Sequence, residues 1–70
     1  MISKRHTLNT FSFIIGLDII NASRRLKAVN YTLRVVRKDG DNFIVTMDFC
    51  SNRINVSVKN DVIVELLSIG

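Results

Sequence analysis

The strict alternation of apolar and polar residues in "RINVSV" is the feature that most restricts how this chain folds. Ile54, Val56 and Val58 would share one face of an extended strand, with the polar residues on the other, because successive side chains of a strand point to opposite sides. Asn60 and Asp61 then supply a tight turn, since both residue types tolerate positive φ angles. The run "VIVELLSI" follows, so a final antiparallel hairpin is predicted.

A helix and a further strand precede this hairpin. Asp18 is a suitable N-cap for a helix over residues 19–29, with basic residues on its polar face. The apolar face of this helix would comprise Ile19, Ala22, Leu26 and Val29. The β-branched run "YTLRVV" predicts a strand over residues 31–37. About fifteen residues, opened by the turn-forming "DGDN", separate this strand from Arg53, which favours a parallel pair over a hairpin.

These elements predict an α+β fold: one helix packed on a small mixed β-sheet, with a long exposed loop between two parallel strands. The 70 residues suffice for a single domain, in which residues 1–10 are expected to form a flexible N-terminal arm. The residues expected to fill the core are Ile19, Leu26, Leu33, Val35, Ile54, Val56 and Val58.

Size and composition favour a binding module over an enzyme. A chain this short buries only about 60% of its unfolded surface, so an active site would compete with a marginal core. The single Cys50 excludes an internal disulfide, and no His and Cys cluster has metal-ligand spacing, so neither a metal nor a cofactor is expected. No catalytic triad or phosphate-binding motif is recognisable either.

The apolar residues 11–20 follow a basic start, as in a secretory signal, but Gly16 and Asp18 interrupt them and no small-residue cleavage site follows. The run is also shorter than the roughly 20 residues of a membrane span. We therefore expect no membrane insertion, and either a cytoplasmic location or release without a signal peptide.

The ten Lys and Arg residues give a formal net charge of +4, which is compatible with nucleic-acid binding. They are scattered along the chain, and no aromatic residues alternate with them as in proteins that stack single-stranded bases. A solvated basic surface is therefore favoured over a nucleic-acid interface. Nucleic-acid binding stays an alternative, and its strength should fall steeply with salt.

The predicted long loop carries apolar residues without a periodic pattern. Phe43, Ile44, Val45, Met47 and Phe49 have no regular face to occupy, so a large part of them should be exposed. An exposed, extended apolar segment is suited to insertion as a strand into a partner's cleft. The opposing interpretation is that Met47 and Phe49 fold inward and fill gaps in the core.

Three motifs, "IVTMDF", "RINV" and the closing "SIG", resemble in this order the reactive loop, the loop-supporting arginine and the C-terminal glycine of the potato inhibitor I family of serine-protease inhibitors. "FSFIIG" is similar to a further family motif, with Phe11 in place of tryptophan and Ser12 in place of proline. Asp18 and Ala22 fall on the family's helix cap and helix alanine. "RINV" is also similar to a related bacterial and fungal group of small elastase-type inhibitors. The resemblance covers residues 11–70.

The resemblance implies an inhibitor of subtilisin-, chymotrypsin- or elastase-like serine proteases that is not itself an enzyme. Met47 would fill the protease's primary specificity pocket, and the bond from Met47 to Asp48 would be the scissile bond. The protease-binding loop would comprise Ile44, Val45, Thr46, Met47, Asp48, Phe49 and Cys50. Arg53 and Asn55 would support it, Asn55 standing where the family has a second arginine. A monomer is expected, and the alternative is the same scaffold binding a partner that is not a protease.

Overall fold

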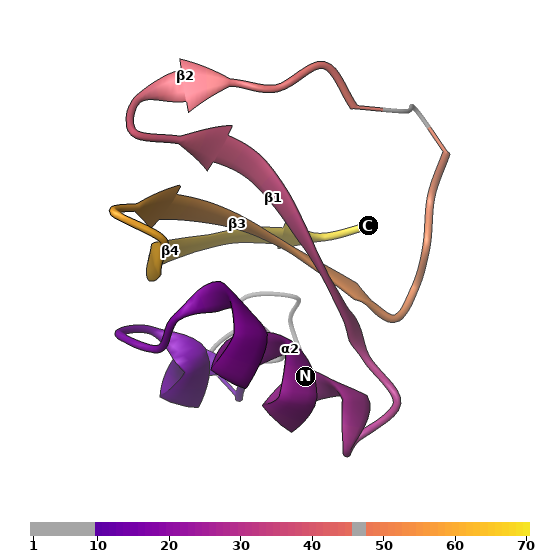
Figure 1. Ribbon diagram of the computed structural model, residues 1–70. Helices are drawn as coiled ribbons and strands as arrows, with labels where there is room; N and C mark the ends of the chain where they lie inside the picture. Colours follow the sequence, from indigo (N-terminus) through magenta and orange to yellow (C-terminus); the bar gives the residue numbers. More distant parts are fainter. Residues whose placement is uncertain (1–9, 46–47) are drawn as a thin grey trace.

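A mixed four-stranded sheet with one α-helix beneath it forms the framework of this computed structural model, which describes residues 10–45 and 48–70 (Figure 1). The elements are η1 (Ser12–Ile14), α2 (Ile19–Lys27), β1 (Thr32–Lys38), β2 (Asp41–Asn42), β3 (Arg53–Lys59) and β4 (Val62–Ile69). The strand order is β2-β1-β3-β4, with β1 and β3 parallel and the other two pairs antiparallel. The predicted α+β fold and its parallel pair are confirmed.

Two parts of the chain lie outside the described residues. The N-terminal arm predicted for residues 1–10 falls there up to residue 9, and so do Thr46 and Met47 of the predicted loop. Within residues 10–45 and 48–70, no helix has the length and the apolar character that a membrane crossing requires.

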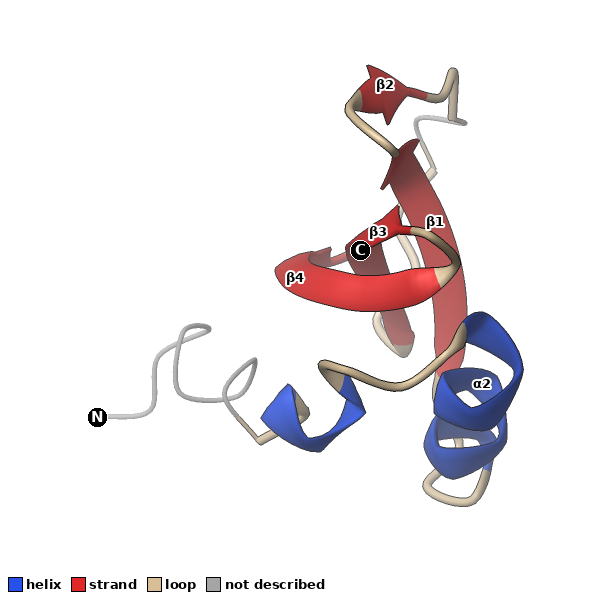
Figure 2. Ribbon diagram, turned by 60° about the vertical axis from the view of Figure 1, so that its left-hand side comes forward, coloured by secondary structure: helices blue, strands red, loops and turns tan. Residues whose placement is uncertain are grey.

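Helix α2 begins where the sequence predicts. The Asp18 side chain accepts a 2.9 Å hydrogen bond from the backbone N–H of Asn21, which satisfies one of the unpaired donors of the first turn. Ala22 and Leu26, four residues apart on one face, are fully buried against the sheet. Figure 2 shows α2 and η1 on the same side of the sheet.

The cap at Asp18 provides a direct test of the helix. Asp18→Ala removes the side-chain acceptor, so we expect a loss of about 1 kcal/mol in the free energy of unfolding, measured by urea denaturation. Asp18→Asn keeps an acceptor at the same position while removing the charge, and it should retain most of that stability. Equal losses in both variants would mean that the charge, and not the cap hydrogen bond, stabilises the helix.

The helix ends two residues earlier than predicted. The N–H of Tyr31 donates to the carbonyl of Leu26 at 2.9 Å and that of Asn30 to Lys27 at 3.0 Å, while Asn30 has a φ of 64°. This pattern is a Schellman motif, which reverses the chain direction after the helix. The reversal leaves Val29 50% exposed, so its predicted place on the buried face is wrong.

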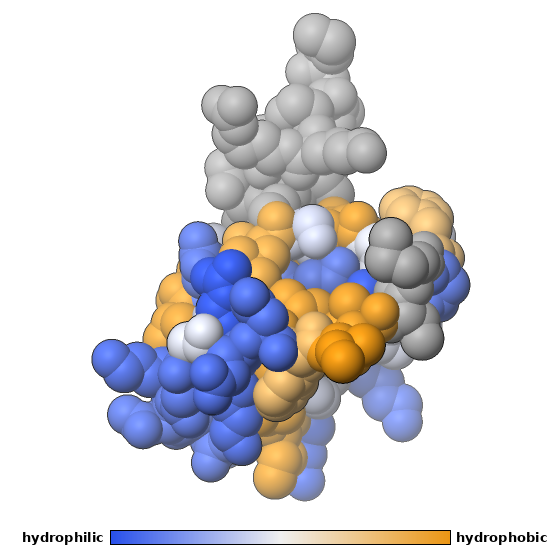
Figure 3. Space-filling view, turned by 90° about the horizontal axis from the view of Figure 1, so that it is seen from above, coloured by the Kyte–Doolittle hydropathy of each residue, from blue (hydrophilic) through white to orange (hydrophobic). Residues whose placement is uncertain are grey.

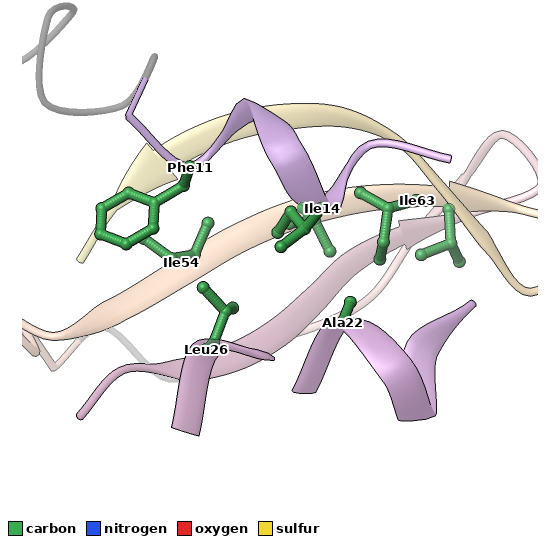
Figure 4. Close-up of a cluster of buried hydrophobic side chains, with 8 residues drawn as sticks. Phe11, Ile14, Ala22, Leu26, Ile54 and Ile63 are labelled. Atoms are coloured by element: carbon green, nitrogen blue, oxygen red, sulfur yellow. The ribbon is translucent and has the colours of Figure 1, made fainter. Parts of the chain in front are cut away.

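The core lies between the helical segments and one face of the sheet (Figure 4). Of the seven predicted core residues, Leu26, Ile54, Val56 and Val58 are buried, and the other three are partly buried and packed against them. Four further apolar residues, which were not predicted for the core, are also buried: Phe11, Ile14, Ala22 and Ile63. Phe11 also packs on Tyr31, with ring centroids 4.5 Å apart, so residues 11–14 close one end of the core.

Both turns of the sheet use left-handed residues. Asn60 and Asp61 have φ angles of 54° and 63°, which confirms the predicted turn between β3 and β4. Asp39 and Gly40 form a similar turn, with φ of 51° and 88°. This turn is predicted from the sequence to open the long loop, but the two residues after it pair with β1 as strand β2. The irregular connection is therefore shorter than predicted and spans residues 43–52.

Candidate functional site

The connection 43–52 between β2 and β3 contains residues 44–50, which are predicted from the sequence to form the binding loop. Three of its described apolar residues, Phe43, Ile44 and Phe49, are exposed, with Ile44 at 104% and Phe49 at 72% of their full accessible areas. Val45 and Cys50 are half-buried, and Asp48 is exposed. Figure 3 looks onto this side of the molecule, where apolar side chains gather beside a polar area. For Phe49, the interpretation as a gap-filling core residue is wrong, since most of its surface is open to solvent.

Arg53 connects this segment to the sheet. It is the first residue of β3, and its side chain is only 17% exposed. Nη2 donates to the backbone oxygen of Asp48 at 3.1 Å and lies 3.5 Å from the Asp48 carboxylate, and Nε donates to the Gly70 oxygen at 2.8 Å. The N–H of Gly70 in turn donates to the Arg53 carbonyl at 2.9 Å. One guanidinium therefore holds both Asp48 and the residue that follows β4.

Asn55 lies one pleat further along β3 and is 6% exposed. Its Oδ1 accepts a 2.8 Å hydrogen bond from Nε of Arg34, and its Nδ2 donates to Oγ of Ser68 at 3.0 Å and to the Gly70 oxygen at 3.3 Å. Gly70 is thus an acceptor for both residues that the resemblance implies as loop supports. Asn55 is linked through it to Arg53, and through Arg53 to Asp48.

The aromatic ring of Phe49 lies beside this group of hydrogen bonds. A Cβ built on Gly70 would stand 3.6 Å from Cδ1 of Phe49 and 3.7 Å from Nδ2 of Asn55, which is ordinary van der Waals contact. Phe49 therefore has one side against the support and most of its surface open to a partner. Such a ring can contribute binding area at a low cost in conformational entropy.

A second attachment, which the sequence analysis missed, is made by Asn52. Its backbone oxygen accepts from the N–H of Thr32 at 2.8 Å, and its Nδ2 donates to the carbonyl of Asn30 at 3.0 Å. Its Oδ1 accepts from the Cys50 thiol at 2.9 Å. The bonds to Thr32 and Asn30 tie the end of the connection to the start of β1 and to the turn before it. Asn52 directly precedes the alternating run. The preference of Asn for turns is the sequence signal that could have indicated its place at the end of the connection.

Arg34 and Ser68 are also functional candidates that the sequence analysis did not name. Both face Asn55 because of strand register: Arg34 pairs with Asn55 across the parallel ladder, and Ser68 pairs with it across the antiparallel one. Every buried side-chain nitrogen and oxygen of the described residues has a hydrogen-bond partner. The buried polar atoms around Asn55 are therefore all hydrogen-bonded, which favours one arrangement of these side chains.

Among residues 10–45 and 48–70, no three His, Cys, Asp or Glu side chains come together as a metal site would require. The arrangement around Arg53 contains donors, acceptors and exposed apolar groups, which suit the binding of another protein chain.

The chain was compared with family models, curated proteins and solved structures. None of them matches it. What the connection 43–52 does must therefore be argued from its own residues and their contacts.

Proposed function

We propose that this chain is a serine-protease inhibitor whose residues 44–50 enter the protease's active-site cleft as an extended strand. The bond from Met47 to Asp48 would lie at the catalytic serine, with Met47 in the primary specificity pocket. An unbranched apolar side chain at that position suits subtilisin-, chymotrypsin- and elastase-like enzymes, whose pockets carry no acid. The order of "IVTMDF" before "RINV" supports this proposal, because it resembles the inhibitor family in the residues of both loop and support.

The observation that carries the proposal is the double attachment of Arg53 to Asp48 and Gly70. A nanomolar inhibitor needs about −12 kcal/mol of binding free energy. Ordering a loose loop would consume about 0.5 to 1.5 kcal/mol for each side chain that becomes fixed on binding. A half-buried arginine that already holds Asp48 before the protease arrives removes part of this cost.

The position of this attachment also favours inhibition over hydrolysis. Asp48 follows the scissile bond, so it would carry the amine that leaves when a serine protease forms its acyl-enzyme. Arg53 holds the Asp48 backbone oxygen at 3.1 Å, and Asn52 fixes the chain four residues beyond Asp48. A leaving group that is held in place stays at high effective concentration and re-forms the peptide bond before water can enter. The protease would then remain occupied by an uncleaved loop.

The proposal is tested by titrating the chain against subtilisin, chymotrypsin, elastase and trypsin. We expect nanomolar inhibition of at least one of the first three, and inhibition of trypsin that is weaker by about 100-fold or more, because its pocket acid finds no partner in Met47. The control is a synthetic peptide of residues 43–52, which lacks the sheet and should be cleaved rapidly without inhibiting. Failure to inhibit any of the four enzymes would refute the proposal and favour a scaffold that binds a partner other than a protease.

A further inference from the structure

Arg34 lies outside the connection 43–52 and outside the strand that supports it. It belongs to β1, where it is paired with Asn55 in the parallel register, and it is half-buried. Its Nε donates to Oδ1 of Asn55 at 2.8 Å, a short hydrogen bond to a side chain that is 94% removed from solvent. A charged donor in such surroundings interacts strongly, because little water competes for the acceptor.

This contact determines which way the Asn55 amide points. A guanidinium has only donors, whereas an amide has an accepting oxygen on one side and a donating nitrogen on the other. With Arg34 facing it, Asn55 must turn Oδ1 toward β1 and Nδ2 toward β4. Nδ2 then reaches Oγ of Ser68 at 3.0 Å and the Gly70 oxygen at 3.3 Å. A reversed amide would place two oxygens, those of Asn55 and Gly70, against each other.

The Gly70 oxygen is where this arrangement meets the loop support. It accepts from Asn55 and from Nε of Arg53, at 3.3 and 2.8 Å. The same guanidinium of Arg53 continues to the backbone oxygen of Asp48 at 3.1 Å. A continuous series of hydrogen bonds thus runs from Arg34 through Asn55, Gly70 and Arg53 to Asp48, although Arg34 and Asp48 belong to different segments.

We infer that Arg34 is a positioning residue of the candidate binding loop: it orients the Asn55 amide, which fixes Gly70 and through it the guanidinium of Arg53. The inference rests on the proposed function for its effect on inhibition, while the positional effect on Arg53 is independent of it. The neutral side chain of Asn55 can support the loop because the Arg34 guanidinium on β1 sets the orientation of its amide. The loop is therefore held by three strands of the sheet.

Inhibition tests the inference with the protease that the wild type binds most tightly. Arg34→Met removes the donors and keeps an unbranched apolar stem, so we expect the inhibition constant to rise about tenfold and the cleavage of the loop to accelerate. Arg34→Lys keeps a charged donor and should recover part of the loss. In an Asn55→Ala background, at least half of the effect of Arg34→Met should disappear, because the two residues act in series.

Two matched controls separate positioning from general stability. Arg25→Met makes the same substitution on the exposed part of α2 and should leave the inhibition constant and the rate of loop cleavage unchanged. Ile63→Val shortens a side chain in the core and should lower stability without accelerating cleavage. The positioning role is overturned if Ile63→Val accelerates cleavage as much as Arg34→Met does. It is also overturned if Arg34→Met changes neither the inhibition constant nor the cleavage rate.

A spectroscopic measurement decides the inference even if the wild type inhibits no protease. The Nε–H of Arg53 gives its own NMR signal, and in the wild type its exchange with water should be slow because it is bonded to Gly70. Arg34→Met should shift this signal and accelerate its exchange about tenfold, although Arg34 lies one strand away. An unchanged Arg53 signal in that variant would overturn the inference. If the wild type inhibits no protease but the Arg53 signal responds to Arg34→Met, only the proposed function is overturned.

Discussion

Arg53→Met is expected to turn the chain from an inhibitor into a substrate. The variant loses the hydrogen bonds at 2.8 and 3.1 Å and the ion pair at 3.5 Å, so Asp48 and Gly70 both lose their contacts with the Arg53 guanidinium. A hydrogen bond to a charged group contributes about 1.5 to 3 kcal/mol, and two such losses correspond to an inhibition constant that rises by at least about 100-fold. The weaker inhibition is measured as the inhibition constant. Cleavage of the bond from Met47 to Asp48 is followed by mass spectrometry.

The control for this variant is again Arg25→Met, which changes the same residue type on the exposed part of helix α2. Both variants are measured well below their unfolding temperatures, so that cleavage reports on the loop of the folded chain. If Arg53→Met inhibits as tightly as Arg25→Met and is cleaved no faster, then Arg53 does not restrain the loop. The proposed mechanism would then lose its main support.

The three long strands of the sheet, β1, β3 and β4, were predictable because their signals are local. The alternation at Ile54, Val56 and Val58 encodes one buried face, and all three residues are buried as expected. The length of the connection between β1 and β3 indicated the parallel pair, because a parallel pair needs a long crossover whereas a hairpin needs only a short turn. Turn chemistry located Asn60 and Asp61 at positive φ, because few other residue types accept that conformation.

The network around the candidate site was only partly predictable, because its contacts join residues that are distant in the sequence. Arg34 and Asn55 are 21 positions apart and meet only in the parallel register. That register shifts between Val35 and Arg37, so Val36 has no partner on β3, and its carbonyl instead accepts from the N–H of Phe43 at 2.9 Å. An alternating pattern cannot reveal such a bulge, because the pattern fixes which face a residue occupies and not which residue stands beside it.

The same limit explains the two elements that the sequence analysis missed. Strand β2 has only two residues, both exposed, so it carries no apolar pattern, and its pairing with β1 is supported by the Asn42 side chain, whose Oδ1 accepts from Nε of Arg37 at 3.0 Å. The segment η1 is three residues long and buries only Ile14. Elements this short are stabilised by what they contact, and periodicity needs a longer window.

Met47→Arg is expected to transfer inhibition from chymotrypsin- and subtilisin-like enzymes to trypsin. Met47 lies outside the described residues, so its proposed role rests on the family resemblance of the sequence, and this substitution tests that role directly. In an apolar pocket the guanidinium would be buried without a partner, and affinity should fall by about 1,000-fold. In trypsin it meets the pocket's acid, and affinity should rise by a similar factor. Inhibition constants against both enzyme types measure the exchange.

The control for this variant is Ile20→Arg, which adds the same charge at a residue of α2 that is 65% exposed. It should alter affinity for every enzyme by less than about threefold, because a charge at a distance from the cleft is screened by salt. If Ile20→Arg raised trypsin inhibition as much as Met47→Arg did, general electrostatic attraction would explain the gain. Unchanged selectivity in Met47→Arg would instead mean that another residue fills the pocket, and exposed Ile44 and Phe49 would be the next to replace.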